Sequence, residues 1–576
     1  MKAAICAIDS QYIHSALAPW CLVAGVAAYA KRPAECEVIE TTINQPLEVI
    51  LEKISRSEAQ VFAISCYIWN IGIVEQIGPA MRTMRPQARI VLGGPEVSFR
   101  PGQILQQWGW VDMVLCGEGE RPFAMLLDAL AAGTDVAHVP GLCYRVQERL
   151  VCQPMYLPQD EPPSPYTQGY LQTLNGRIAY LETTRGCPFS CSFCLSGVEQ
   201  GVRFFSLERA KREMLLLARS GARTIKLVDR TFNCHPGRAY ELFAFLIEHA
   251  GKEIPPGVCF HFEVGADLFD ERTLALLRTA PTGLIQMEAG LQSFYPPTLE
   301  AIRRKTDIEK LEHNLRALIA IDNMHIHIDL IAGLPYEDAE EFGRSFDRAF
   351  ALRPHMLQLG FLKMLHGSPI RGQAEQWRYR FDSRAPYEIT ENQWLSQTDR
   401  QMLHVVEDVL ERMYNSGRFL QTLDYLLSAT GLRPFALFTA MGQGIAGLGE
   451  TAGVSLDDYT ERIWQVGQTL KGVAPMQLRD ALVTDRLCTE NTGRIPPCLR
   501  VEDRRLKRYT KEVRARACYQ TNPGVKAGTA ILYAGTERLL VVDYARREAL
   551  RGRYAWHIEP IQDEQGLART GNGPVQ

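Results

Sequence analysis

The sequence predicts an α/β protein with a doubly wound parallel sheet at its amino end, a second β/α repeat in the middle and a mostly helical carboxyl end. Three observations support this fold class. Short apolar runs alternate with amphipathic segments over the first 150 residues, the alternation returns between residues 177 and 366, and helix-like periodicity dominates from residue 385. At 576 residues the chain is long enough for about three domains with substantial cores.

The composition is that of an ordinary soluble globular protein, with 46% hydrophobic and 22% charged residues. The formal net charge of −3 argues against wholesale binding to nucleic acid or anionic membranes. No apolar run approaches the ~18 residues of a membrane span, and the opening run MKAAICAI is too short for a signal peptide. We therefore expect a cytoplasmic protein with no membrane partner, and we do not expect nucleic acid as a partner.

Five strand-like runs make up the first domain, which we place at residues 1–150. They are MKAAICAI, CEVIET, VFAISCYI, RIVLGGPE and DMVLCGEGE. Short buried-type strands joined by amphipathic segments indicate a doubly wound parallel sheet, and glycines at the strand ends let a backbone approach a ligand closely. No G-x-G-x-x-G follows the first strand, so the sequence disfavours a dinucleotide.

Three cysteines, Cys187, Cys191 and Cys194, cluster in the segment TRGCPFSCSFC. Most of the fifteen cysteines lie in apolar runs, where a thiol packs as a small hydrophobe rather than forming a bridge. The β-branched run IAYLETT precedes the cluster and breaks at Gly186, which places the three thiols on a loop beyond the carboxyl end of a strand. Four thiolates would complete a zinc site or a cubane cluster, whereas three leave one position open for another ligand.

Strand-like runs recur through the central domain, which we place at residues 173–384 after a linker at 151–172. After IAYLETT come TIKLVDR, CFHFEVGAD, LIQMEAGLQS, HIHIDLIAGL and HMLQLGFLKML. Six strands are too few to close an eight-stranded barrel, and the polar residues at their carboxyl ends are the candidates for a site.

The C-x3-C-x2-C spacing, with the aromatic Phe193 before the last cysteine, resembles the signature of the radical S-adenosylmethionine (SAM) enzymes. The resemblance implies a partial (β/α)6 barrel in which Cys187, Cys191 and Cys194 hold a 4Fe-4S cluster. SAM then chelates the fourth iron, which accounts for the missing fourth cysteine. A zinc site or a chance spacing is the alternative explanation.

The same resemblance implies SAM-binding residues at the strand ends. Asp229 lies in VDRTFN, which is similar to an acidic family segment near the SAM amino group, although Arg230 stands where the family has a second acid. The segment DLIAGLP resembles the one that packs on adenine. Each carboxylate could instead pair with an arginine or cap a helix. The full set of implied SAM-binding residues is Phe193, Asp229, Glu263, Glu288, Gln292, Ile331 and Gly333.

Placed before such a barrel, the first domain resembles the cobalamin-binding module of the cobalamin-dependent radical SAM group. The resemblance rests on three loops, SCYIWN, GGPE and GEGE. The Asp-x-His-x-x-Gly motif that ligates cobalt in methionine-synthase-type modules is absent, so Tyr67, Trp69 and His14 are the candidates to face the cobalt. A fold that only buttresses the barrel is the alternative. The implied cobalamin-binding residues are Ser65, Tyr67, Trp69, Gly93, Gly94, Pro95, Glu96, Gly117, Glu118 and Gly119.

The carboxyl-terminal part, residues 385–576, is expected to be mostly helical, with a small hairpin formed by AILYAG and LLVVDY. Residues 500–516 carry eight basic and three acidic side chains. This stretch could contact phosphate, although a solvated helix face is the simpler explanation. The order of the three parts resembles cobalamin-dependent radical SAM proteins with a carboxyl-terminal domain of unknown function, and we expect this domain to shape the substrate pocket.

The resemblance implies an enzyme that cleaves SAM reductively at the 4Fe-4S cluster. It implies transfer of a methyl group from methylcobalamin to an unactivated centre of an unknown substrate, with an electron donor of flavodoxin or ferredoxin type. No side chain is assigned as a catalytic acid or base. Two alternatives stay open: a cyclase or rearranging oxidoreductase that uses the same cofactors, and a non-catalytic cobalamin or iron-sulfur binding protein.

Overall fold

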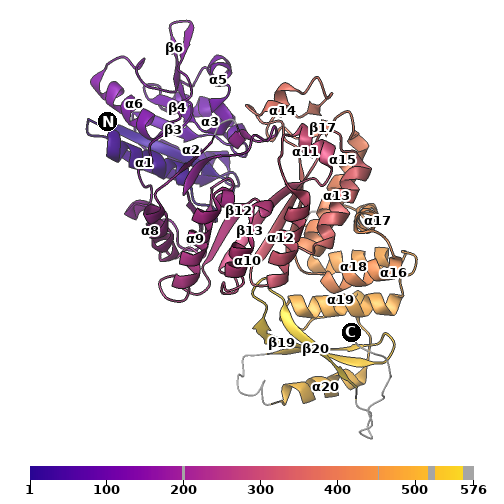
Figure 1. Ribbon diagram of the computed structural model, residues 1–576. Coiled ribbons are helices and arrows are strands. Elements are labelled where there is room, and N and C mark those ends of the chain that lie inside the picture. The colour runs from indigo at the N-terminus through magenta and orange to yellow at the C-terminus, as the bar shows by residue number, and fades with distance from the viewer. Residues whose placement is uncertain (198–200, 452, 517–525, 562–576) are drawn as a thin grey trace. The chain divides into compact units, whose positions relative to one another are not determined.

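The computed structural model describes residues 1–197, 201–451, 453–516 and 526–561 (Figure 1). The chain divides into two compact units. Unit 1 comprises Met1–Glu288, Pro297–Asn314 and Phe361–Gln393, and unit 2 comprises Ala289–Pro296, Leu315–Gly360 and Trp394–Gln576.

A seven-stranded sheet forms the amino-terminal domain of unit 1, in the order β2-β1-β3-β4-β5-β6-β7. The first five strands are parallel, as the sequence predicts, and the last two add an antiparallel hairpin. The hairpin was not predicted because its two strands are short and mix charged with apolar residues. The strands are β1 (Lys2–Asp9), β2 (Glu35–Thr42), β3 (Val61–Ser65), β4 (Arg89–Gly93), β5 (Met113–Leu115), β6 (Leu142–Val146) and β7 (Arg149–Cys152).

Helices cover both faces of this sheet, and each face has its own core. Along β1, Ala4 and Cys6 belong to one hydrophobic cluster, whereas Ala3 and Ile5 belong to the other. Successive residues of a strand point to opposite faces, so this alternation requires apolar cover on both sides. The doubly wound arrangement is therefore confirmed. Its helices are α1 (Leu17–Tyr29), α2 (Leu47–Ser55), α3 (Ile71–Met84), α4 (Pro95–Ser98), α5 (Pro101–Gln107) and α6 (Glu120–Ala132).

Cys143 and Cys152 oppose each other in the register of β6 and β7 and are joined by a disulfide. This pair differs from the expectation that cysteines outside the cluster pack as free thiols. The disulfide was not expected because it joins the two strands of a hairpin that the sequence analysis did not predict.

A six-stranded sheet follows, in the order β15-β14-β13-β12-β11-β8. Its strands coincide with the six predicted runs, and helices separate them along the chain. The strands are β8 (Ile178–Leu181), β11 (Thr224–Leu227), β12 (Cys259–Val264), β13 (Ile285–Gln292), β14 (His325–Ala332) and β15 (Met356–Phe361). The main helices are α8 (Leu207–Ala218), α9 (Pro236–His249), α10 (Glu271–Leu277), α11 (Pro296–Ala301), α12 (Ile308–Ile321) and α13 (Ala339–Ala351).

Short elements flank the central sheet. They include the hairpin of β9 (Thr184–Cys187) and β10 (Gly201–Phe204), which carries the first cluster cysteine. The others are α7 (Gln168–Gln172), α14 (Pro369–Gly372), β16 (Arg380–Phe381) and β17 (Ile389–Glu391).

The carboxyl-terminal part of unit 2 is mostly helical, as predicted. It ends in an antiparallel sheet of the order β18-β19-β20, so the predicted hairpin is a three-stranded sheet. The third strand was not predicted, although its sequence YAWHIEP alternates Tyr, Trp and Ile with Ala, His and Glu, a pattern typical of a strand. The elements are α15 (Gln397–Val409), α16 (Leu420–Thr430), α17 (Pro434–Gly447), α18 (Leu456–Gly467), α19 (Pro475–Thr489), α20 (Arg504–Arg514), β18 (Ala527–Leu532), β19 (Arg538–Arg547) and β20 (Tyr554–Pro560).

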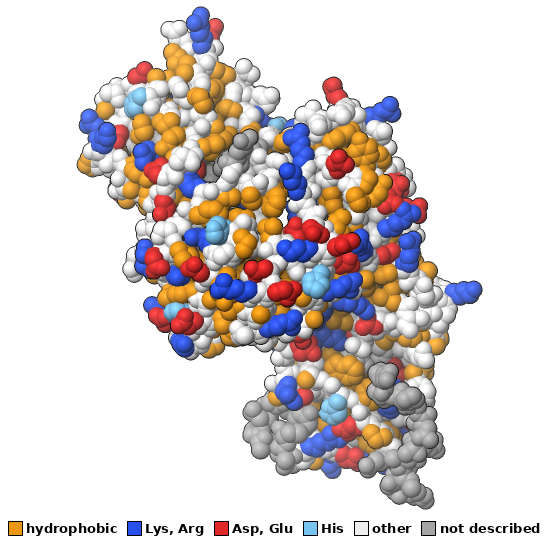
Figure 2. Space-filling view, viewed as in Figure 1, with side chains coloured by type: hydrophobic (Ala, Val, Ile, Leu, Met, Phe, Trp, Pro, Cys, Tyr) orange, Lys and Arg blue, Asp and Glu red, His pale blue; other side chains and the backbone are white. Residues whose placement is uncertain are grey.

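Figure 2 shows blue and red side chains interspersed over the viewed face, in keeping with the small net charge. Among the residues that the structure describes, no helix is long and apolar enough to span a bilayer.

Candidate functional site

The cluster loop begins at a close backbone approach in unit 1. Cys187 ends β9 opposite Gly201 of β10, and Gly186 has a φ of 90°. A Cβ atom on Gly186 would lie 2.3 Å from the Gly201 carbonyl oxygen, so only glycine fits there. The backbone N–H of Ser192 donates to the Ile302 carbonyl (2.9 Å), and its carbonyl accepts from the N–H of Ile370 (2.9 Å). The loop is therefore held at its amino end and at Ser192.

The three predicted thiols influence one another and share one cationic neighbour. Cys191 is 6% exposed, and Cys187 and Cys194 are half-buried. Burial raises the pKa of the Cys191 thiol, the Arg304 guanidinium lowers it, and Cys194 and Cys187 raise it again. The Arg304 Nη1 atom lies 3.9 Å from the Cys191 Sγ atom. Three converging sulfurs beside an arginine fit an anionic 4Fe-4S cluster bound through three thiolates.

Asp229 is fully buried, and its carboxylate binds the end of β8. It accepts hydrogen bonds from the backbone N–H groups of Thr183 (2.7 Å) and Thr184 (3.2 Å), and also from the Thr183 hydroxyl. Burial raises the pKa of Asp229 to about 6. This carboxylate thus fixes the chain segment that leads into the cluster loop, while its contact with SAM stays a prediction.

Glu263 and Glu288, two predicted SAM-binding residues, meet around a lysine that the sequence analysis missed. The Lys226 Nζ atom lies 3.1 Å from the Glu288 Oε2 atom and 3.9 Å from the Glu263 Oε1 atom. The His261 Nε2 atom lies 3.0 Å from the same Glu288 oxygen. These four residues come from three adjacent strands. The sequence signal for this lysine was its place between two apolar residues in the strand-like run TIKLVDR.

The loop after β1 brings His14 to the central sheet. The His14 Nδ1 atom lies 2.7 Å from the Tyr180 hydroxyl of β8. The pKa of His14 is lowered by burial and by the positive charges of Lys226 and Arg177, which favours the neutral imidazole. A polar group of the first domain is thus placed beside the polar strand residues of the second.

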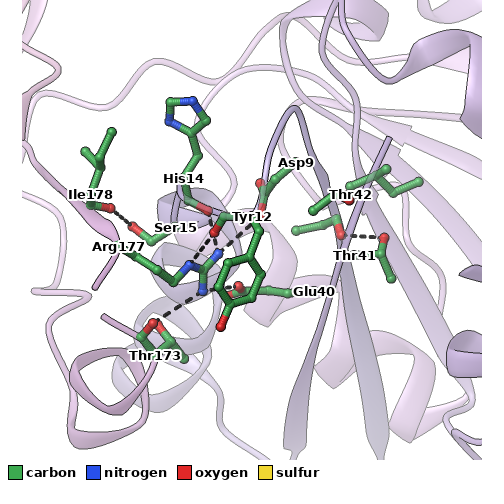
Figure 3. Close-up of polar contacts among 12 residues, drawn as sticks. Asp9, Tyr12, His14, Ser15, Glu40, Thr41, Thr42, Thr173, Arg177 and Ile178 are labelled. Atoms are coloured by element: carbon green, nitrogen blue, oxygen red, sulfur yellow. Dashed lines mark hydrogen bonds and ion pairs between the residues drawn. The ribbon is translucent and has the colours of Figure 1, made fainter. Parts of the chain in front are cut away.

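Arg177 holds this loop in position, as Figure 3 shows. Its side chain is 7% exposed and donates to the Tyr12 carbonyl (2.9 Å) and to the Glu40 carboxylate (2.6 Å). The Ile178 N–H donates to the Ile13 carbonyl (2.8 Å), and an isolated parallel bridge joins His14 to Ile178 at the start of β8. The position of His14 is therefore set by buried contacts on both sides.

Two aromatic rings lie at the carboxyl end of β3, in the first predicted cobalamin loop. Tyr67 and Trp69 stack with ring centroids 4.3 Å apart and planes 5° from parallel. The Trp69 indole N–H donates to the Ile8 carbonyl (3.2 Å), and the Asn70 side chain donates to Ile8 (3.1 Å) and Ser65 (2.9 Å). Trp69 stays 45% exposed, so the loop presents a fixed flat surface that suits the face of a large planar ligand.

The GGPE loop turns at Gly94, which has a φ of 103°. A Cβ atom there would lie 2.6 Å from the Cys66 carbonyl oxygen. The Glu96 carboxylate is buried and accepts hydrogen bonds from Arg100 (3.0 Å) and from the Tyr387 hydroxyl (2.5 Å). The Glu96 carboxylate is thus bound by protein groups. Ser65, Gly93, Pro95 and Gly119 lie at the same carboxyl edge of the sheet.

The GEGE loop is tied to the cluster hairpin by buried ion pairs. Arg185 of β9 pairs with Glu118, with Glu120 (2.6 Å) and with Glu182 (2.8 Å). Arg203 of β10 pairs with Glu118 as well (2.5 Å). Gly117 turns next to these residues with a φ of 92°. The loop proposed for cobalamin and the hairpin that carries Cys187 are therefore fixed relative to each other within unit 1.

In unit 2, Glu337 follows the predicted adenine-packing segment that holds Ile331 and Gly333. The Glu337 carboxylate is buried and accepts hydrogen bonds from the hydroxyls of Ser293 (2.6 Å) and Ser345 (3.0 Å). Ser293 directly follows Gln292 at the end of β13. Burial raises the pKa of Glu337 to about 7.

Replacing Glu337 by glutamine is expected to stabilise unit 2 at high pH. Because the folded-state pKa is raised, wild-type stability is highest below about 4.5 and falls as the pH rises towards about 7. Glutamine accepts the same serine hydroxyls without a buried charge, so the free energy of unfolding should rise by up to about 3 kcal/mol at pH 8 and little at pH 5. Urea unfolding at both pH values measures this. Glu340→Gln, at an exposed carboxylate of α13, should show no such trend, and an equal effect of both variants would contradict the prediction.

Three protein families match the chain in succession. The "B12 binding domain" matches residues 21–127, the "Radical SAM superfamily" matches residues 181–349, and the "Protein of unknown function (DUF4080)" matches residues 375–525. The chain belongs to the cobalamin-dependent radical SAM family. The domain types confirm the predicted cofactor set of a 4Fe-4S cluster, SAM and cobalamin.

Two curated relatives of this radical SAM protein are methyltransferases. It is 32% identical over 302 residues to the cobalamin-dependent radical SAM methyltransferase TokK of Streptomyces tokunonensis, covering 50% of this chain and 44% of that one. It is 30% identical over 303 residues to the 2-(S-pantetheinyl)-carbapenam-3-carboxylate methyltransferase of Streptantibioticus cattleyicolor, with the same coverage. The chain therefore spans about half the length of the curated relatives it matches.

Solved structures share the fold. The radical SAM methyltransferase TsrM of Kitasatospora setae, with cobalamin and a 4Fe-4S cluster bound, has a TM-score of 0.55 and 19% identity, covering 65% of this chain and 75% of that one. The cobalamin-dependent radical enzyme OxsB, with aqua-cobalamin and SAM bound, has a TM-score of 0.57 and 13% identity, covering 90% of this chain and 81% of that one.

Proposed function

We propose that this protein is a cobalamin-dependent radical SAM methyltransferase. One observation supports the proposal above the others: in unit 1 the carboxyl-end loops of the B12-binding sheet contact the strands and the hairpin of the radical SAM core. An enzyme that uses both cofactors on one substrate needs their binding edges next to each other. A protein that only binds cobalamin or only carries electrons has no need of this contact. The methyltransferase names of the two similar relatives support the reaction type.

Bound cofactors supply the steps that side chains cannot, because a carbon-bound hydrogen is too weakly acidic for a side-chain base. The chain's own residues position them. Cys187, Cys191 and Cys194 would hold the cluster, and Arg304 would offset its negative charge. The stacked pair of Tyr67 and Trp69 would support the corrin. An external electron donor of flavodoxin or ferredoxin type is part of the proposal.

The polar strand residues between the two edges form the proposed substrate pocket. Tyr180, Lys226 and His261 offer a hydroxyl, an ammonium and an imidazole on adjacent strands, beside the predicted SAM-binding carboxylates of Glu263 and Glu288. Because Lys226 is already paired with Glu288, it can bind a substrate carboxylate or hydroxyl without leaving an isolated charge. We therefore propose a polar substrate. The Lys226→Met variant is expected to keep both cofactors while losing product formation.

Product analysis tests the reaction type. The reconstituted chain is supplied with hydroxocobalamin, SAM and dithionite, and the nucleosides are separated by chromatography. Both 5′-deoxyadenosine and S-adenosylhomocysteine are expected, because methyl transfer consumes SAM in two ways. Deoxyadenosine alone would favour the cyclase or rearrangement alternative. That alternative has a relative of its own, the anaerobic magnesium-protoporphyrin IX monomethyl ester cyclase of Rubrivivax gelatinosus, 25% identical over 353 residues. Neither nucleoside from a fully loaded chain would contradict the proposal.

Replacing Trp69 by alanine is expected to weaken cobalamin binding by about tenfold or more, since it removes one ring of the exposed stacked pair. Equilibrium dialysis with hydroxocobalamin, read by absorbance, measures the dissociation constant. Met84→Ala removes another exposed apolar side chain, at the far end of α3, and serves as the control. Equal affinity of the Trp69→Ala variant and the wild type would remove Trp69 from the proposed cobalamin site.

A further inference from the structure

A cavity of about 450 Å³ lies in the carboxyl-terminal part of unit 2, to which the proposed function assigns no role. Its walls come from α20, from β18 and from the loops at 491–495 and 500–502. Figure 1 shows α20 beside the small sheet, in yellow near the carboxyl end. A volume of this size is typical of sites for small organic ligands.

One face of α20 lines the cavity while another packs on the sheet. Leu506, Thr510 and Arg514 are spaced by four residues and face the cavity. Tyr509 and Val513 point into the hydrophobic cluster beneath the sheet. The packing of the second pair fixes the rotation of the helix, so Arg514 is held at the cavity by the fold.

Three cations of the cavity have no carboxylate partner. Among the residues that the structure describes, no carboxylate lies within ion-pair distance of Arg500, Arg514 or Lys526. Other arginines of this region do have such partners, as with Arg494 and Asp457 (3.1 Å) or Arg479 and Asp480 (2.7 Å). Among the lining residues that the structure describes, Glu502 carries the one carboxylate. An excess of positive charge at a concave site favours an anionic ligand.

Hydroxyl groups and apolar side chains define the rest of the lining. The Thr510 and Thr529 hydroxyl oxygens lie 2.7 Å apart at the junction of α20 and β18. The Thr510 hydroxyl donates to the Leu506 carbonyl (2.7 Å), so the donors left for a ligand are the guanidinium and ammonium groups, which suit the oxygens of a phosphate group. Ile495, Val501 and the ring of Tyr533 add an apolar surface on which an organic group can rest.

We propose that this cavity binds the phosphate group of a small phosphorylated organic molecule. The three cations that lack a carboxylate partner among the described residues would bind the phosphate, the apolar surface would bind the organic group, and Glu502 would accept a hydrogen bond from a ligand hydroxyl or amine. The proposal gives the basic stretch of residues 500–516 a specific role, in place of a solvated helix face. It does not depend on the proposed methyl transfer.

The test measures binding of uridine 5′-monophosphate (UMP) to the full chain with its cofactors, by calorimetry at constant salt. Uridine, which is UMP without the phosphate group, serves as the uncharged control ligand. The double variant Arg500→Gln/Arg514→Gln removes two lining cations, and Lys507→Gln/Lys511→Gln removes two exposed cations of the same helix outside the cavity. Thermal unfolding checks that both stay folded, and Lys526→Gln provides a second lining variant.

We expect UMP to bind the wild type and the helix control, uridine to bind neither, and the lining variants to bind UMP at least about tenfold more weakly. Equal weakening in the lining and control double variants would overturn the proposal, because only net charge would matter. An absence of millimolar binding by the wild type would overturn it as well. A ten-residue oligouridylate that binds far more tightly than UMP, with steep salt dependence, would also overturn it in favour of an extended polynucleotide surface.

Discussion

Replacing Cys191 by alanine is expected to abolish the iron-sulfur cluster and SAM cleavage while the chain still folds. In sequence, Cys191 lies between Cys187 and Cys194, and its thiol lies beside Arg304. The variant would leave two thiolates, which cannot bind three irons of a cubane cluster. Iron and sulfide analysis after anaerobic reconstitution should show loss of nearly all cluster iron. The 5′-deoxyadenosine yield in the presence of SAM and dithionite should fall to background.

Cys36→Ala is the matched control for the Cys191 variant. Cys36 is also a free cysteine of unit 1, but it lies on β2, away from the cluster loop. This variant should keep the iron content and the SAM cleavage of the wild type. A Cys191→Ala variant with full iron and activity would contradict a cluster bound through all three cysteines.

Replacing Arg185 by glutamine is expected to destabilise unit 1 by about 3–5 kcal/mol. Its guanidinium pairs with Glu118, Glu120 and Glu182, all largely buried, so its loss leaves buried carboxylates without a partner. Because Arg185 also lies two residues before Cys187, the same variant should bind less cluster and less cobalamin. Urea unfolding, with iron and cobalamin content determined on the same sample, measures both effects.

Arg121→Gln is the control variant with which the loss of stability in Arg185→Gln is compared. Arg121 also pairs with a carboxylate of unit 1, Asp160 (2.7 Å), but both side chains are about half exposed. An exposed pair contributes about 0–1 kcal/mol, so this variant should be close to wild type. If the two variants lowered the free energy of unfolding equally, the buried network would not be the connection between the loop and the hairpin that we infer.

The elements that the sequence predicted well carry local signals. The parallel strands are continuous apolar runs, and the three cysteines have a spacing that identifies them without any tertiary information. The β6 and β7 hairpin was missed because its short, mixed sequences resemble a loop, whereas β20 carries a strand-type alternation that the prediction did not include.

The contacts that complete the site could not be predicted, because they join residues far apart in the chain. Arg304 and Cys191 are separated by 113 positions, and Arg185 and Glu118 by 67. Hydrophobic periodicity shows which face of an element is buried, but it does not show which charged residue of one element will meet a charged residue of another. The lysine in TIKLVDR is the clearest example, since its sequence marks only an unusual polar residue in a buried strand.

The 5′-deoxyadenosine yield of anaerobic protein loaded with both cofactors tests the central claim most directly. The sample is first shown to hold about four irons and one cobalamin per chain, as expected for one 4Fe-4S cluster and one corrin. SAM and dithionite are then added, and the nucleoside is quantified. We predict 5′-deoxyadenosine from the wild type and none above background from Cys191→Ala. A fully loaded wild type that leaves SAM intact would contradict the assignment of this chain as a radical SAM enzyme.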